Sequence, residues 1–75
     1  VRLFPNPSSG TVYLDAAGLE VEAIQLYDWT GRLLATPAVP QRGRALALPE
    51  QLSGTYLVRI QTTAGLISKR LVLLR

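Results

Sequence analysis

The 75-residue sequence contains no cysteine and no histidine. Without cysteine it can form neither a disulfide bond nor a thiolate metal site, and without histidine it lacks the commonest general base and metal ligand. It also contains no Walker loop for nucleotides and no Gly-x-Ser-x-Gly nucleophile motif. Because these residue types cannot supply a paired nucleophile and base, we expect a non-catalytic domain without a cofactor.

Acidic residues are few, and their only cluster, formed by Asp15, Glu20 and Glu22, lacks the ligand spacing of a calcium loop. Residues 1–31 carry one basic and four acidic side chains, whereas residues 32–75 carry seven basic and one acidic. This asymmetry can indicate a polyanionic partner, although an ordinary solvated face explains it equally well. Basic residues are not interleaved with stacking aromatics, so we expect no nucleic-acid partner.

Long apolar runs are also absent. The longest aliphatic run, residues 71–74, is far shorter than the ~20 residues of a membrane helix, so we expect no direct membrane insertion. With 48% hydrophobic and 17% charged residues, the chain is too apolar to be disordered, and its length suits one small domain, residues 1–75. Since it begins without methionine, we expect a piece of a longer protein, with any export signal upstream.

Strand-like segments recur about every ten residues, separated by Gly, Pro, Asn and Ser, as is typical of a sandwich or barrel. The predicted strands are residues 1–4, 11–14, 21–29, 32–36, 44–48, 56–62 and 66–74. Prolines are poorly tolerated in central strands, so residues 37–43 are predicted to form a loop that crosses between sheets. The pattern therefore predicts an all-β fold with antiparallel strands.

Residues two apart share one side of a strand, which assigns the faces. Ile24, Leu26, Tyr56, Val58 and Ile60 are predicted to point inward. The final segment alternates less cleanly, because apolar residues occupy both of its sides around Lys69-Arg70. Either a bulge shifts the register there, or both faces of residues 71–74 are covered.

Two motifs in the first half have structural and functional interpretations. Pro5-Asn6-Pro7 predicts a stiff turn, or alternatively a recognition or processing border. Asp28 with Gly31 and Arg32 predicts a hairpin turn whose carboxylate accepts backbone N–H groups. Trp29 within that turn is expected to close one end of the core; alternatively it stacks on sugars.

Two further motifs occur in the C-terminal third. Gly54 permits a conformation or a close approach that a Cβ would forbid, and Tyr56 is expected to anchor the start of a strand. Lys69 and Arg70 interrupt an apolar strand, where charge commonly prevents sheets from pairing edge to edge. A basic pair followed by an apolar tail can also be recognised by strand addition.

The chain resembles the C-terminal sorting domain of the type IX (Por) secretion system. The resemblance rests on an ordered set of segments: residues 3–10, 24–28 with Gly31 and Arg32, 52–58 and 69–73. The resemblance implies a seven-stranded, antiparallel immunoglobulin-like β-sandwich at the C-terminus of a cargo protein. It implies passage through the periplasm of a Gram-negative bacterium to the outer membrane, followed by surface display or secretion. The implied partners are the outer-membrane translocon, a sortase that normally removes the domain, and the cargo fused before Val1.

The same resemblance suggests roles for particular residues. Translocon or sortase recognition maps onto Gly54, Tyr56, Lys69 and Arg70, whereas a structural motif maps onto Pro5, Asn6, Pro7, Asp28, Gly31 and Arg32. The alternative is an accessory carbohydrate-binding or fibronectin-like module that uses Trp29, Tyr27 and Tyr13 as a stacking platform. A third interpretation is a simple spacer.

Overall fold

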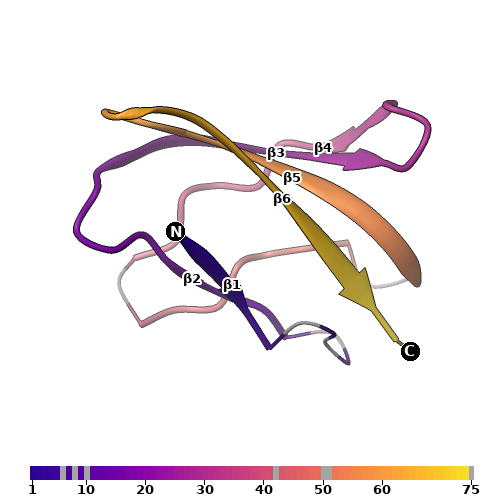
Figure 1. The fold of residues 1–75 in the computed structure, drawn as a ribbon. Coiled ribbons are helices and arrows are strands. Elements are labelled where there is room, and N and C mark those ends of the chain that lie inside the picture. Colours follow the sequence, from indigo (N-terminus) through magenta and orange to yellow (C-terminus); the bar gives the residue numbers. More distant parts are fainter. Residues whose placement is uncertain (6, 8, 10, 42, 50–51, 75) are drawn as a thin grey trace.

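The structure is a computed structural model that describes residues 1–5, 7, 9, 11–41, 43–49 and 52–74. The described residues contain no helix and form two antiparallel sheets (Figure 1), which confirms the all-β prediction. The strands are β1 (Arg2–Phe4), β2 (Tyr13–Asp15), β3 (Val21–Asp28), β4 (Leu33–Ala35), β5 (Gly54–Thr62) and β6 (Gly65–Leu73). No helical segment capable of crossing a membrane occurs in this described part of the chain.

The larger sheet has the strand order β4-β3-β5-β6, and the smaller sheet consists of β1 and β2. β3, β5 and β6 are long, and their side chains alternate between more and less buried positions, except at a bulge between Val21 and Ala23 of β3. Figure 1 shows the short strands of the smaller sheet lying across one face of the larger sheet. Among the described residues, no strand or helix covers the other face of the larger sheet.

The hydrophobic core lies between the two sheets. All five residues predicted to point inward are buried, which confirms the assignment of faces in β3 and β5. The smaller sheet and its neighbouring segments complete the same cluster; its buried members are Leu3, Val12, Ile24, Leu26, Leu46, Tyr56, Val58, Ile60, Leu71 and Leu73. Burying one such aliphatic side chain stabilises a fold by about 1.5–3 kcal/mol. Residues of both sheets therefore contribute to the free energy of unfolding of the whole domain.

The predicted strand at residues 44–48 is not formed, so seven strands are not confirmed in the described part of the chain. The segment makes one bridge, between Tyr13 and Ala45, and the Leu46 amide donates to the Val12 carbonyl oxygen at 2.7 Å. Leu46 is nevertheless only 4% exposed. Its apolar side chain belongs to the core, but the neighbouring β2 is too short to extend the ladder.

The loop prediction for residues 37–43 is confirmed for its described positions, none of which lies in a strand. This loop leaves β4 in the larger sheet and leads to Ala45 beside β2 in the smaller sheet. Proline fixes φ and removes a hydrogen-bond donor, which accounts for the absence of strand around Pro37 and Pro40. The chain therefore changes sheets here, as expected.

Candidate functional site

The C-terminal hairpin of β5 and β6 carries the residues that the sequence singled out for recognition. The two strands pair without a break from Gly54 opposite Leu73 to Thr62 opposite Gly65. The proposed bulge near Lys69 is therefore wrong. Coverage of both faces is also wrong, because Leu71 and Leu73 are buried whereas Leu74 is 59% exposed.

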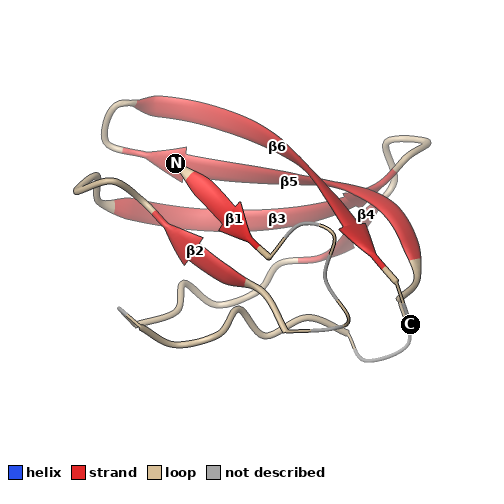
Figure 2. Cartoon of the chain, turned by 60° about the horizontal axis from the view of Figure 1, so that its bottom comes forward, coloured by secondary structure: helices blue, strands red, loops and turns tan. Residues whose placement is uncertain are grey.

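β6 is an edge strand of the larger sheet (Figure 2). It pairs with β5 on one side and with no strand of that sheet on the other. Across the two sheets, β1 is the strand that approaches it. An edge strand is where a further chain can be added to a sheet in other proteins.

Lys69 and Arg70 lie on opposite sides of this edge strand. Lys69 is half-buried and shares the inward side with Leu71, opposite Val58 of β5. Arg70 is exposed on the outward side, opposite Leu57. Because adjacent residues of a strand alternate, the basic pair presents one cation to each side of β6 and does not form a single charged patch.

Gly54 and Tyr56 organise the start of β5. Gly54 has a φ of +119°, and a Cβ there would have no neighbouring atom within 4 Å, so its backbone conformation accounts for the glycine, and close approach does not. The hydroxyl of Tyr56 accepts from the Ser53 amide at 3.0 Å and donates to the Ser53 carbonyl oxygen at 2.9 Å. Since Tyr56 is only 9% exposed, it is an anchor beneath the surface, as the strand-start interpretation expected.

The β3–β4 turn confirms the structural prediction for Asp28, Gly31 and Arg32. The Asp28 Oδ1 atom accepts from the amides of Thr30 and Arg32, each at 2.9 Å, and from the Thr30 hydroxyl at 2.5 Å. Gly31 has a φ of +91°, and its amide donates to the Asp28 carbonyl oxygen. These hydrogen bonds hold the pKa of Asp28 below its ordinary value of 3.8. The bond from the Thr30 hydroxyl has the largest effect, and the bond from the Arg32 amide the next largest.

The expectation that Trp29 closes the core is wrong, because its side chain is 63% exposed at the turn. The three-ring platform is not assembled either. Tyr27 alternates with buried Leu26 and so lies on the outer side of the larger sheet, where Arg59 covers its ring at 5.7 Å. Tyr13 belongs to the smaller sheet on the opposite side, and its ring stacks on Phe4.

At the N-terminal motif, Pro5 and Pro7 are exposed and the Phe4–Pro5 peptide bond is cis, whereas Asn6 lies outside the described residues. The motif directly follows β1, whose Phe4 ring lies between the Tyr13 ring, at 5.7 Å, and the Arg2 guanidinium, at 4.8 Å. These contacts fit the interpretation of a turn at the start of the domain.

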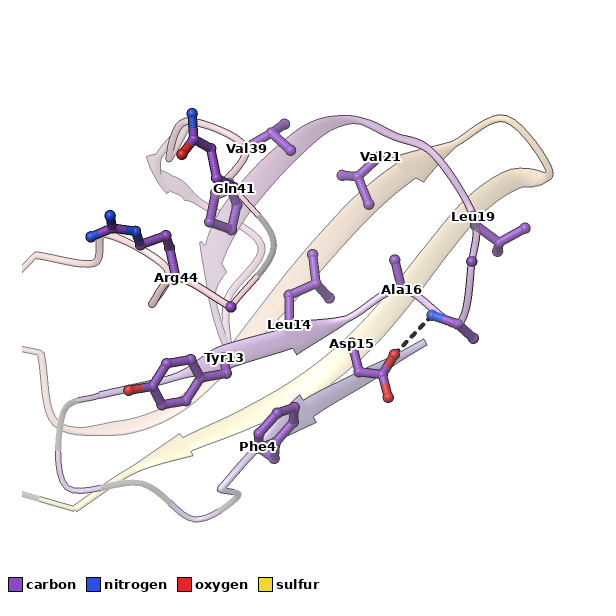
Figure 3. Close-up of a pocket in the computed structure, with 14 residues that line it drawn as sticks. Phe4, Tyr13, Leu14, Asp15, Ala16, Leu19, Val21, Val39, Gln41 and Arg44 are labelled. Atoms are coloured by element: carbon purple, nitrogen blue, oxygen red, sulfur yellow. Dashed lines mark hydrogen bonds between the residues drawn. The ribbon is translucent and has the colours of Figure 1, made fainter.

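An open groove of about 700 Å³ lies beside this aromatic pair (Figure 3). Its walls come from β2, the connection to β3 and the described residues 39–41, 43 and 44; labelled lining residues include Tyr13, Leu14, Asp15, Val21, Val39, Gln41 and Arg44. Asp15 is already engaged, since it accepts from the Ala17 amide at 2.9 Å and lies 4.0 Å from Arg2. No sequence motif marks the groove, because its walls are distant in sequence and meet only in the folded chain.

Two stacked antiparallel sheets define the class of the molecule: a small all-β domain with a hairpin at one edge of the larger sheet. The chain belongs to the family of type IX (Por) C-terminal sorting domains, since the family model described as "Secretion system C-terminal sorting domain" matches residues 2–74. No curated protein and no solved structure matches the chain.

Members of this family are generally non-catalytic C-terminal secretion signals. Membership implies interaction with the secretion machinery and a cargo on the N-terminal side of the domain. It also implies transit to the outer membrane, followed by secretion or display at the cell surface. The recognition roles of Gly54, Tyr56, Lys69 and Arg70 stay predictions.

Proposed function

We propose that residues 1–75 form a single sorting domain that carries a cargo through the type IX translocon, and that the machinery recognises β6. In this proposal the domain is an immunoglobulin-like sandwich, reaches the translocon from the periplasm, and is removed by a sortase after transport. The domain itself catalyses nothing. Its task is to present one strand in a defined shape.

The observation that carries this proposal is the position of β6 at the edge of the larger sheet. The alternating side chains of β6 would provide the specificity of recognition at this edge. Arg70 would contact the partner from the outer side, while Lys69 would do so from the inner side. Tyr56 and Gly54 support the proposal indirectly, because they fix the start of β5, which pairs with the end of β6.

The positions of the chain ends also support recognition through β6. Both views place the N-terminal and C-terminal ends on opposite sides of the molecule (Figures 1 and 2). A cargo attached before Val1 would therefore leave the domain away from Leu74. The end of β6 would stay accessible to the machinery while the cargo is still attached.

Export of a fused reporter tests the proposal. A reporter that carries residues 1–75 should reach the surface of type IX-competent cells, whereas Lys69→Ala with Arg70→Ala should leave most of it in the periplasm. Of the single variants, Arg70→Ala should have the larger effect, because Arg70 is exposed and Lys69 is half-buried. The measurement is the surface fraction of the reporter at equal total expression.

Arg2→Ala with Arg44→Ala is the matched control, since it removes the same charge at two exposed positions outside β6. This control should leave export unchanged. If both double variants export equally well, recognition through the basic residues of β6 is wrong. Periplasmic retention of the unmodified fusion would contradict the sorting function itself.

A glycan-binding module is the second candidate, and only the groove beside Tyr13 and Phe4 favours it. Aromatic rings beside polar side chains are common in sugar sites, and Gln41 and Arg44 line this groove. Titration with soluble polysaccharides, followed by the NMR signals of Tyr13, distinguishes the two candidates. Saturable shifts at Tyr13 without any export of the reporter would favour glycan binding.

A further inference from the structure

The uncovered side of the larger sheet is here called the outer face. It consists of the paired outward residues of the four strands: Ala23, Gln25, Tyr27, Leu33, Thr55, Leu57, Arg59, Gln61, Leu66, Ser68, Arg70 and Val72. None of these paired residues is acidic, although two of them are arginines. The exposed carboxylate of Glu22 lies beside Ala23 at the bulge of β3, so two cations on the outer face stand against one acidic side chain at the end of this strand.

One row of side chains crosses the whole outer face. Leu33 of β4 pairs with Tyr27 of β3, Tyr27 pairs with Leu57 of β5, and Leu57 pairs with Arg70 of β6. Side chains directly opposite each other on one face of a sheet interact. The row is therefore a continuous apolar and aromatic strip that ends at a guanidinium group, and Leu33 within it is 48% exposed.

A shallow depression of about 230 Å³ lies beside this row, lined by Ala23, Gln25, Arg59, Gln61 and Leu66. The short side chain of Ala23 leaves space among longer neighbours. Within the described part of the chain Arg59 forms no ion pair, and its guanidinium lies over the Tyr27 ring.

Donor groups at the depression come from Arg59 and Gln25, whereas the side-chain amide of Gln61 already donates to the Thr62 carbonyl oxygen at 3.3 Å. The Tyr27 hydroxyl donates to Gln25 Oε1 at 3.1 Å, so the carbonyl oxygen of Gln25 is occupied and its amide N–H groups can donate elsewhere. The guanidinium of Arg59 only donates. A phosphate fits this chemistry, because it supplies both the negative charge and the acceptor oxygens.

We propose that the outer face docks the domain on an anionic lipid surface, with a headgroup phosphate at Arg59 and the apolar row against the interface. Basic residues are attracted to anionic headgroups, and tyrosine and leucine are suited to the interfacial layer. A second copy of the chain is disfavoured, because its own arginines would approach Arg59 and Arg70. The docking requires no inserted segment, and it goes beyond the sorting role without depending on it.

Vesicle co-sedimentation of the 75-residue chain tests this proposal. The chain should bind vesicles of equal parts phosphatidylcholine and phosphatidylglycerol, and bind pure phosphatidylcholine vesicles weakly. Arg59→Gln should lower the binding constant for the anionic vesicles about fivefold, which is the effect expected from the loss of one charge near an anionic surface. Arg59→Lys should retain most binding, and Leu33→Gln should weaken it although the charge is unchanged.

Arg44→Gln is the control, because Arg44 is exposed beside the groove at the smaller sheet and its loss changes the net charge equally. If Arg44→Gln and Arg59→Gln weaken vesicle binding equally, the proposal that one defined face binds the lipid is wrong. Equal binding of the chain to neutral and anionic vesicles would contradict it as well. Inorganic phosphate that shifts the Arg59 and Gln61 NMR signals without any vesicle binding would identify a free-anion site instead. Binding of polyglutamate but not of vesicles would point to an acidic polypeptide. Either of these last outcomes overturns the lipid proposal, and none of them affects the export assay.

Discussion

Tyr56 shows how one buried polar group fixes local geometry at the residue scale. Its hydroxyl forms two hydrogen bonds to the backbone of Ser53, and the Ser53 hydroxyl donates in turn to the Leu73 carbonyl oxygen at 3.5 Å. The ring contributes to the core while the hydroxyl orders the loop before β5. The start of one strand and the end of its neighbour are therefore coupled through two side chains.

Tyr56→Phe should lower the free energy of unfolding by about 1–2 kcal/mol, because the Ser53 amide loses its acceptor in a partly buried place. Urea denaturation measures this change. Tyr27→Phe is the matched control: its hydroxyl donates to Gln25 on the outer side of the sheet, so its loss should cost less than about 0.5 kcal/mol. Equal losses would mean that the Ser53 bonds contribute nothing specific.

Gly54→Ala should destabilise the domain by about 1–2 kcal/mol, because alanine is strained at a φ of +119°. No clash adds to this strain, since space is open around the missing Cβ. A neutral Gly54→Ala, measured by thermal unfolding, would show that the backbone there relaxes freely.

Asp28 gives the domain a defined response to pH. Its pKa is lowered in the folded state, so the unfolded chain takes up the proton first as the pH falls. The stabilisation by Asp28 is therefore fully present above its ordinary pKa of 3.8 and is lost as the pH falls toward the lowered folded value. The stability difference between wild type and Asp28→Asn should be largest near neutral pH and should shrink below pH 3.8.

Thr30→Val separates the causes of this shift, because the Thr30 hydroxyl is the largest of them. In this variant the pKa of Asp28 should rise toward its ordinary value, while the bond from the Arg32 amide still lowers it in part. Titration of the Asp28 carboxyl carbon by NMR reports the change directly. An unchanged pKa in Thr30→Val would contradict the role assigned to the hydroxyl.

At the element scale, local patterns predicted the long strands well. Period-2 burial in β3 and β5 could be inferred from their own sequences, because each has one face in the core. The ambiguity in β6 could not be resolved that way, since Val72 and Leu74 are as apolar as the buried Leu71 and Leu73. Only the pairing with β5 shows which side is inward.

The segment of residues 44–48 shows a different limit of the sequence pattern. The sequence predicted a strand here, and although no strand forms, Leu46 is buried. Strand formation also needs a partner of matching length, and β2 offers only three residues, one of which meets Ala45. The exposure of Trp29 and the groove beside Tyr13 were likewise beyond prediction, because both depend on where the turns and loops lie in the folded chain.

Leu46→Ala should therefore cost about 2–4 kcal/mol, as expected for truncating a buried leucine, despite the lack of a strand around it. Leu48→Ala, two residues along and half-buried, should cost clearly less. Chemical denaturation of both variants provides the comparison. If Leu46→Ala is nearly neutral, the segment is a surface loop and does not contribute to the core.

At the scale of the whole molecule, the two sheets share one core, and this decides how the domain unfolds. Leu3 and Val12 belong to the smaller sheet and its flank, whereas Leu71 belongs to β6, yet all three lie in the same buried cluster. Neither sheet has a second core to stabilise it alone. The domain should therefore unfold in one cooperative transition.

Leu3→Ala tests this cooperativity, because it removes apolar volume from the smaller sheet only. Methyl NMR signals of Val12 and Leu71 should disappear at the same urea concentration, and the variant should shift both transitions equally. Trp29 fluorescence is a poor probe for this purpose, since its side chain is already 63% exposed in the folded chain. A Val12 transition that precedes that of Leu71 would mean that the smaller sheet opens first. The edge strand β6 would then lose its neighbour β1 before the larger sheet unfolds, and recognition of β6 could begin from that opened state.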